Sequence, residues 1–175
     1  MSTAIGRPQP DEHAPYYSRY IERVPEGDLL DDLAAQSEVV AAAFLGLLPE
    51  KVDFRYAPGK WTPREMLGHM IDGERVMAFR ALWFARADPN PLPGFEEDDW
   101  AAAAHHGDVP LADLVDEWRA ARASHVQLFR HLPAEVWTRR GVANGQPVSV
   151  RALAYIQAGH ARHHLAILEE RYLSA

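Results

Sequence analysis

Four long segments of this 175-residue chain repeat apolar residues at intervals of three and four. They cover residues 28–48, 62–87, 111–131 and 149–172, and no comparable stretch alternates apolar and polar residues as a strand would. This spacing puts the apolar side chains on one face of a helix, which must then pack against other helices. We therefore predict an all-α fold, a four-helix bundle with long crossover connections in place of minimal loops.

The start of the second helix is the clearest boundary in the sequence. Thr62 is the expected N-cap, Pro63 occupies the first helical position, and Glu65 completes a capping box. Ser149 is the expected cap of the last helix, and Asn144-Gly145 just before it is typical of a type I′ hairpin turn.

The remaining segments set the domain limits. Residues 1–15 are rich in Pro and polar groups, which predicts a flexible N-terminal tail, and residues 16–175 form one domain. The loop 88–99 is acidic and rich in Pro. Its residues Glu96 to Asp99, with Trp100, form either a lid over a site or a solvated acidic loop.

Composition excludes several classes of function. The chain has no cysteine, so disulfides, thiolate metal sites and a cysteine nucleophile are ruled out. A formal charge of -7 disfavours nucleic-acid binding, and no run of about 18 apolar residues is present to span a membrane. We expect a cytoplasmic protein that binds neither nucleic acid nor membrane.

The histidines carry the functional signal. His160 lies near the centre of the apolar face of the last helix, and His164 lies about 40° from it one turn on, whereas His163 lies about 60° to the other side. His69 also faces inward, on the stripe of the second helix that carries Met66. Three neutral imidazoles would bind one divalent transition metal per chain, Zn²⁺, Ni²⁺, Fe²⁺ or Mn²⁺, and leave a position open. The alternative is a set of hydrogen-bonded core histidines.

Nearby residues leave alternatives open. Asp72, one turn from His69, is a candidate catalytic group or a surface charge paired with Arg75. Arg80 is a candidate for binding an anionic substrate, or half of a buried ion pair. Ala161 follows His160, so the glutamate of the protease motif H-E-x-x-H is missing.

Three stretches together resemble one known family. They are YAPGKWTPREMLGHMIDGER (56–75), a Pro-Gly-Phe acidic loop, and NGQPVSVRALAYIQAGHARHHLAILEERYL (144–173), and the chain from about residue 28 onward resembles the DinB superfamily. The resemblance implies a DinB-like four-helix bundle, often dimeric, with a divalent metal on His69, His160 and His164. It also implies metal-dependent transferases or isomerases that act on low-molecular-weight thiols.

Three functions remain open from the sequence. The first is a metal-dependent transferase acting on a small-molecule thiol, or a hydrolase acting through metal-activated water, in a homodimer as the resemblance implies. The second is a non-catalytic, metal-stabilised binding or stress-response protein. The third is a metal-free bundle that binds a partner.

Overall fold

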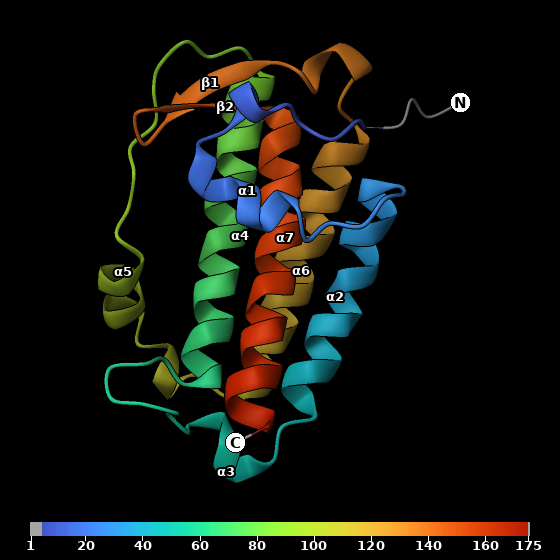
Figure 1. The fold of residues 1–175 in the computed structure, drawn as a ribbon. Coiled ribbons are helices and arrows are strands. Elements are labelled where there is room, and N and C mark those ends of the chain that lie inside the picture. Colours follow the sequence, from blue (N-terminus) through green and yellow to red (C-terminus); the bar gives the residue numbers. More distant parts are fainter. Residues whose placement is uncertain (1–4, 175) are drawn as a thin grey trace.

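The computed structural model describes residues 5–174 and confirms the predicted four-helix bundle (Figure 1). The long helices are α2 (Leu29–Leu45), α4 (Pro63–Ala85), α6 (Leu111–Arg130) and α7 (Val150–Ile167), and α2 and α4 each pack against both α6 and α7. In Figure 1 the chain runs down α2, up α4, up again in α6 and down α7. Because α4 and α6 are parallel, the connection between them must cross the whole length of the bundle. Within residues 5–174, no helix has both the length and the apolar character required to span a membrane.

The helix ends follow the local signals in the sequence. Thr62 Oγ1 accepts from the backbone N–H of Glu65 at 3.2 Å, and the Glu65 carboxylate accepts from the N–H of Thr62 at 2.8 Å, which completes the capping box. Ser149 caps α7 by accepting from the N–H of Ala152 at 3.1 Å. The last helix then continues as a π-helical stretch, Leu168–Leu173.

Short elements fill the connections. Besides single turns of 3₁₀ helix, they are α1 (Ser18–Ile21), α3 (Pro49–Val52), α5 (Glu97–Ala104), and the antiparallel hairpin β1 (Arg140–Ala143) with β2 (Gln146–Ser149). Asn144 and Gly145 have φ angles of 51° and 70°, as a type I′ turn requires. The long α4–α6 connection is attached to this hairpin, because Leu92 donates to Val142 O at 2.9 Å and accepts from the N–H of Asn144 at 3.0 Å.

A buried polar layer crosses the middle of the bundle and separates two apolar clusters. Arg122 of α6 makes a two-bond ion pair with Glu74 of α4, at 2.7 and 2.9 Å. Arg122 also donates to Gln36 Oε1 of α2 at 2.9 Å, and Gln157 of α7 donates to the carbonyl of Glu74 at 3.0 Å. Each long helix therefore contributes to one hydrogen-bonded layer.

The N-terminal segment differs from the expected flexible tail. From Ile5 to Pro15 it lies on the bundle, and Glu12 is buried there. The Glu12 carboxylate accepts from Ser149 Oγ at 2.6 Å and from Arg151 Nε at 2.7 Å. A buried carboxylate needs partners of this kind, and neither is close to it in sequence. Residues 1–4, also part of the predicted tail, lie outside the described residues.

Candidate metal centre

The fold brings the three predicted histidines together between the antiparallel helices α4 and α7. The Nε2 atom of His160 lies 3.1 Å from Nε2 of His69 and 3.0 Å from Nε2 of His164. One nitrogen from each ring falls within 4.8 Å of the other two. Two residues of α7 and one of α4 therefore present three imidazole nitrogens to one point.

This geometry fits a cation better than a hydrogen-bonded cluster. Two nitrogens bound at about 2.0–2.1 Å to a tetrahedral ion lie about 3.4 Å apart, close to the observed spacings. In a neutral imidazole each nitrogen has either one proton or one lone pair, so Nε2 of His160 can satisfy only one of its two neighbours by hydrogen bonding. A cation at their centre can accept all three lone pairs.

The histidines are electrostatically prepared to bind a cation. Burial lowers the pKa of His69 from 6.5 to about 4, against the smaller opposing effect of the Asp98 carboxylate. Burial, followed by the charge of the neighbouring histidines, also lowers the pKa of His160 and His164 well below the usual value. All three rings are therefore neutral at neutral pH, with lone pairs free for a metal.

Packing positions the three rings. The indole of Trp61 lies against His69 with ring centroids 4.5 Å apart, and Tyr20 meets His160 edge-on at 5.5 Å. Nδ1 of His164 is buried and has no hydrogen-bond partner among residues 5–174, so aromatic neighbours hold this ring. An indole at His69, a phenol at His160 and imidazole rings at His164 thus take the place of the carboxylate or carbonyl that usually orients a metal-binding histidine.

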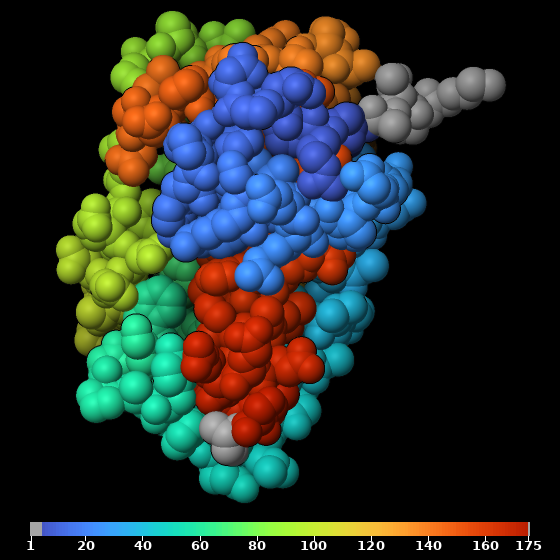
Figure 2. Space-filling model, in the orientation of Figure 1, coloured from blue at the N-terminus to red at the C-terminus, as the bar shows by residue number. Residues whose placement is uncertain are grey.

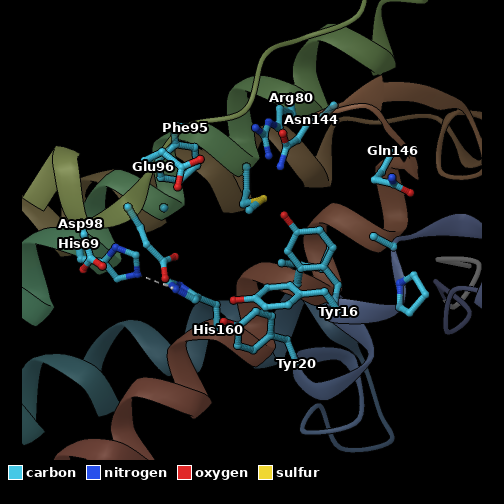
Figure 3. A pocket seen from close by; sticks show the side chains of 18 residues that line it. Tyr16, Tyr20, His69, Arg80, Phe95, Glu96, Asp98, Asn144, Gln146 and His160 are labelled. Carbon is cyan, nitrogen blue, oxygen red and sulfur yellow. Dashed lines mark hydrogen bonds between the residues drawn. The ribbon is translucent and has the colours of Figure 1, made fainter.

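The histidines open onto a cleft of about 640 Å³. His69 and His160 line it, and His160 keeps part of its surface exposed, whereas His164 is buried behind them. Figure 3 shows Tyr16 and Tyr20 on one wall and the Phe95–Asp98 segment on another. In Figure 2 the blue N-terminal segment lies across α7 with the yellow-green α5 region beside it. A small molecule in this cleft would reach the open side of the histidine cluster.

The acidic part of the long connection lies over the cleft. Glu96, Glu97 and Asp98 all line it, and the effect of Asp98 on the pKa of His69 places this carboxylate's charge near the cluster. The sequence left two alternatives for this loop, a lid over a site or a solvated acidic loop. Its position along the cleft favours the first. Its negative charge also favours a cation at the histidines.

Asp72, the candidate catalytic residue, lies elsewhere. It faces a second groove on the outer side of α4, which adjoins the cleft at Arg80 and Phe95, and its carboxylate lies 4.0 Å from the guanidinium of Arg75. Burial raises its pKa. Asp72 is not among the residues that line the cleft, because a rotation of about 60° from His69 takes it around the helix toward the crossover connection. The geometry therefore supports the surface-charge alternative.

Sequence reasoning did not assign several cleft residues to the site. Tyr16 and Tyr20 are apolar anchors by pattern, and Asn144 is a turn residue, yet all three line the cleft. Packing or turn formation already explains each of these residues, so nothing in the sequence indicates that they also line a cleft. Only the docking of the N-terminal segment and the hairpin places them opposite the histidines.

The comparisons with known proteins agree with this fold. The family model of the DinB superfamily matches residues 32–168, and the chain belongs to this superfamily. A protein of Geobacillus thermodenitrificans is 23% identical over 131 residues, 74% of either chain, and one of Geobacillus kaustophilus is 27% identical over 128 residues, 71% of either chain. Both carry the name "Putative metal-dependent hydrolase".

Two solved structures share the architecture. YfiT from Bacillus subtilis, described as a probable metal-dependent hydrolase with an unusual four-helix bundle topology, matches with a TM-score of 0.71 and 14% identity, over 97% of this chain and 93% of YfiT. The mycothiol-dependent maleylpyruvate isomerase matches with a TM-score of 0.67 and 12% identity, over 83% of this chain and 61% of the isomerase. At these identities the likeness shows the fold.

Proposed function

We propose that this protein is a metal-dependent enzyme that holds one divalent transition metal ion on His69, His160 and His164 and acts on a small molecule in the adjoining cleft. The observation that carries the proposal is the convergence of three neutral Nε2 atoms beside a cleft large enough for a substrate. The donor set suits Zn²⁺, Ni²⁺, Fe²⁺ or Mn²⁺.

Such an ion would supply Lewis acidity, lowering the pKa of water or a thiol so that a nucleophile exists near neutral pH. The chain itself orients the reactants. His69 and His160 border the cleft, Tyr16 and Tyr20 close one side, and Asp98 adds negative charge near the cluster. A thiol as the reacting group is supported by the structural likeness to the mycothiol-dependent isomerase, and water by the hydrolase names of the relatives.

A purely structural metal is the competing reading, since an ion here would also tie α4 to α7. The position of His69 and His160 on the wall of the cleft favours catalysis, because a structural site is normally closed. The two readings separate experimentally: in cobalt-substituted protein a small thiol or an anion should change the visible spectrum only if a coordination position is open.

Metal content of untagged protein is the first test. We expect about one transition metal ion per chain in the wild type and in the control His131→Ala, whose side chain is exposed. His69→Ala and His164→Ala should each lose it. Wild-type protein that takes up no ion after incubation with zinc, nickel and manganese would falsify the proposal.

Activity is the second test. Metal-loaded wild type should hydrolyse an activated ester or amide, or conjugate a low-molecular-weight thiol to an electrophile, faster than His160→Ala treated in the same way. Equal rates for the two proteins in both the hydrolysis and the thiol-conjugation assays would show that the protein binds metal but does not catalyse either reaction. The homodimer and the cytoplasmic location stay predictions; light scattering of purified protein tests the first.

A further inference from the structure

Arg80 is a buried cation without an acidic partner. It is 5% exposed, and no carboxylate of the described residues lies within ion-pairing distance of it. Its guanidinium donates to the carbonyl of Pro93 at 2.9 Å and lies over the ring of Phe95, 5.9 Å from its centroid. Arg80 is therefore held in place by neutral groups alone.

Two other arginines with largely buried side chains have carboxylate partners. Arg122 has Glu74, and Arg151 has Glu12. A buried guanidinium without a counter-charge is costly, and only one hydrogen bond from Arg80 to residues 5–174 is formed, so most of its five N–H donors are free for a ligand. Arg80 also lines the cleft, so an anion in the cleft can reach it.

A second polar group borders the same place. The carboxamide of Asn144 packs so closely on Gly94 that a Cβ there would lie 2.3 Å from Asn144 Oδ1. Gly94 follows Pro93, the partner of Arg80, and Asn144 lines the cleft too. Figure 3 shows Arg80 and Asn144 at one end of the cleft and His69 with Asp98 at the other.

The two ends differ in charge and lie far apart. The Asp98 carboxylate lies beside His69, where its charge favours a cation, while the buried arginine stands near Asn144 of the hairpin. His69 and Arg80 are eleven positions apart on α4, or about 16 Å along the helix axis. A ligand that reaches both ends must be elongated.

We propose that Arg80, assisted by Asn144, binds the carboxylate or phosphate group of an elongated substrate whose opposite end reaches the three-histidine site. The guanidinium fork can make two parallel hydrogen bonds to either oxyanion, which a lysine cannot match. The part of this proposal that places the other end of the substrate at the histidines rests on the proposed function. The anion subsite itself needs no metal.

Calorimetric titration of metal-free, full-length protein tests the subsite directly. Inorganic phosphate and glutarate are the probes, and they decide between phosphate and carboxylate. We expect saturable binding of at least one probe to wild type, at least tenfold weaker binding to Arg80→Gln, and several-fold weaker binding to Arg80→Lys. Arg75→Gln is the matched control: it removes the same charge from the same helix, but Arg75 is half-exposed, pairs with Glu117 at 2.7 Å and does not line the cleft.

Binding of neither probe to wild type, or wild-type affinity in Arg80→Gln, overturns the subsite. If Arg80→Gln does not fold, Arg80→Lys provides the test. Wild-type affinity for the probes in Arg80→Lys would show that the two hydrogen bonds of the guanidinium do not bind the oxyanion. Oxyanion binding lost with Arg80 in a protein that takes up no metal would support the subsite and reject the proposed metalloenzyme. Metal uptake without oxyanion binding would reject the anion subsite and leave the proposed metalloenzyme standing.

Discussion

Gly73 and Gly159 have no side chain at two positions where another group lies against α4 and α7. A Cβ on Gly73 would lie 3.1 Å from Cε1 of His160, and one on Gly159 would lie 2.0 Å from the carbonyl oxygen of Tyr20. The first glycine makes room for a ring of the histidine cluster, and the second lets α1 cross α7. At both positions the contact that glycine makes possible offsets the helix stability that glycine costs.

Gly73→Ala should separate helix stability from metal binding. The alanine favours the helix by up to about 1 kcal/mol, so metal-free protein should unfold at the same or a higher urea concentration. The added methyl group pushes the His160 ring by a few tenths of an ångström, and the metal dissociation constant should rise about tenfold. Competition with a chromophoric chelator measures that constant.

Gly107→Ala is the control, because a Cβ there meets nothing within 4 Å. It should leave metal affinity unchanged. Wild-type affinity in Gly73→Ala would mean that the His160 ring tolerates the methyl group without moving.

At the scale of elements, the N-terminal segment is held to the start of α7 by one buried carboxylate. Burial alone would raise the pKa of Glu12, but hydrogen bonds from Arg151 and Ser149 outweigh it and lower the pKa from 4.5 to about 2. The same segment leads into Tyr16 and Tyr20, which form a wall of the cleft. The Glu12 contact therefore supports the site through a segment that is remote from it in sequence.

This contact predicts a pH dependence of stability. Between pH 4.5 and about 2 the unfolded chain binds a proton at Glu12 while the folded chain does not, so stability is present above pH 4.5 and is lost as the pH falls toward 2. Glu12→Gln should lower the free energy of unfolding at pH 7 by about 3 kcal/mol, and most of the difference from wild type should be gone near pH 2.

Urea unfolding at several pH values measures this difference. Glu50→Gln, at an exposed position, should stay within about 0.5 kcal/mol of wild type throughout. A Glu12→Gln deficit that does not change between pH 7 and pH 2 would count against the ion pair as its cause.

At the scale of the whole molecule, the polar layer fixes how the four helices align. Glu74, Arg122, Gln36 and Gln157 come from four different helices and separate two apolar clusters, each of which would accept many helix rotations by itself. Hydrogen bonds in a buried layer have fewer acceptable geometries. Because the histidines lie on α4 and α7 near this layer, it also helps to set their register.

Removing half of the central ion pair should be costly. Glu74→Ala leaves the buried Arg122 uncompensated and should lower the free energy of unfolding by about 3–5 kcal/mol. Replacing both Glu74 and Arg122 by Met should cost less than Glu74→Ala, because no charge is then left buried. Chemical denaturation of the wild type and both variants tests this; a double variant as unstable as Glu74→Ala, or less stable, would contradict the prediction.

Metal binding should be visible in global stability. An ion present at about 100 times its dissociation constant stabilises the fold by about 2.7 kcal/mol, which in a chain of this size raises the melting temperature by roughly 5–10 °C. A chelator should reverse the shift, and His164→Ala should show neither effect. An equal shift in His164→Ala would place the ion elsewhere.

The sequence by itself determined the four helices, their caps at Thr62 and Ser149, the Asn144-Gly145 turn and the inward positions of the three histidines. All of these depend on residues within a few positions of one another, so hydrophobic period and capping chemistry suffice. The tertiary structure alone decided that residues 5–15 dock on the bundle, that Asp72 faces away from the cleft, and that Arg80 borders it without an acidic partner. Those outcomes depend on contacts between segments far apart in the chain, such as Glu12 with Arg151 and Arg80 with Pro93, whose energies no local pattern encodes.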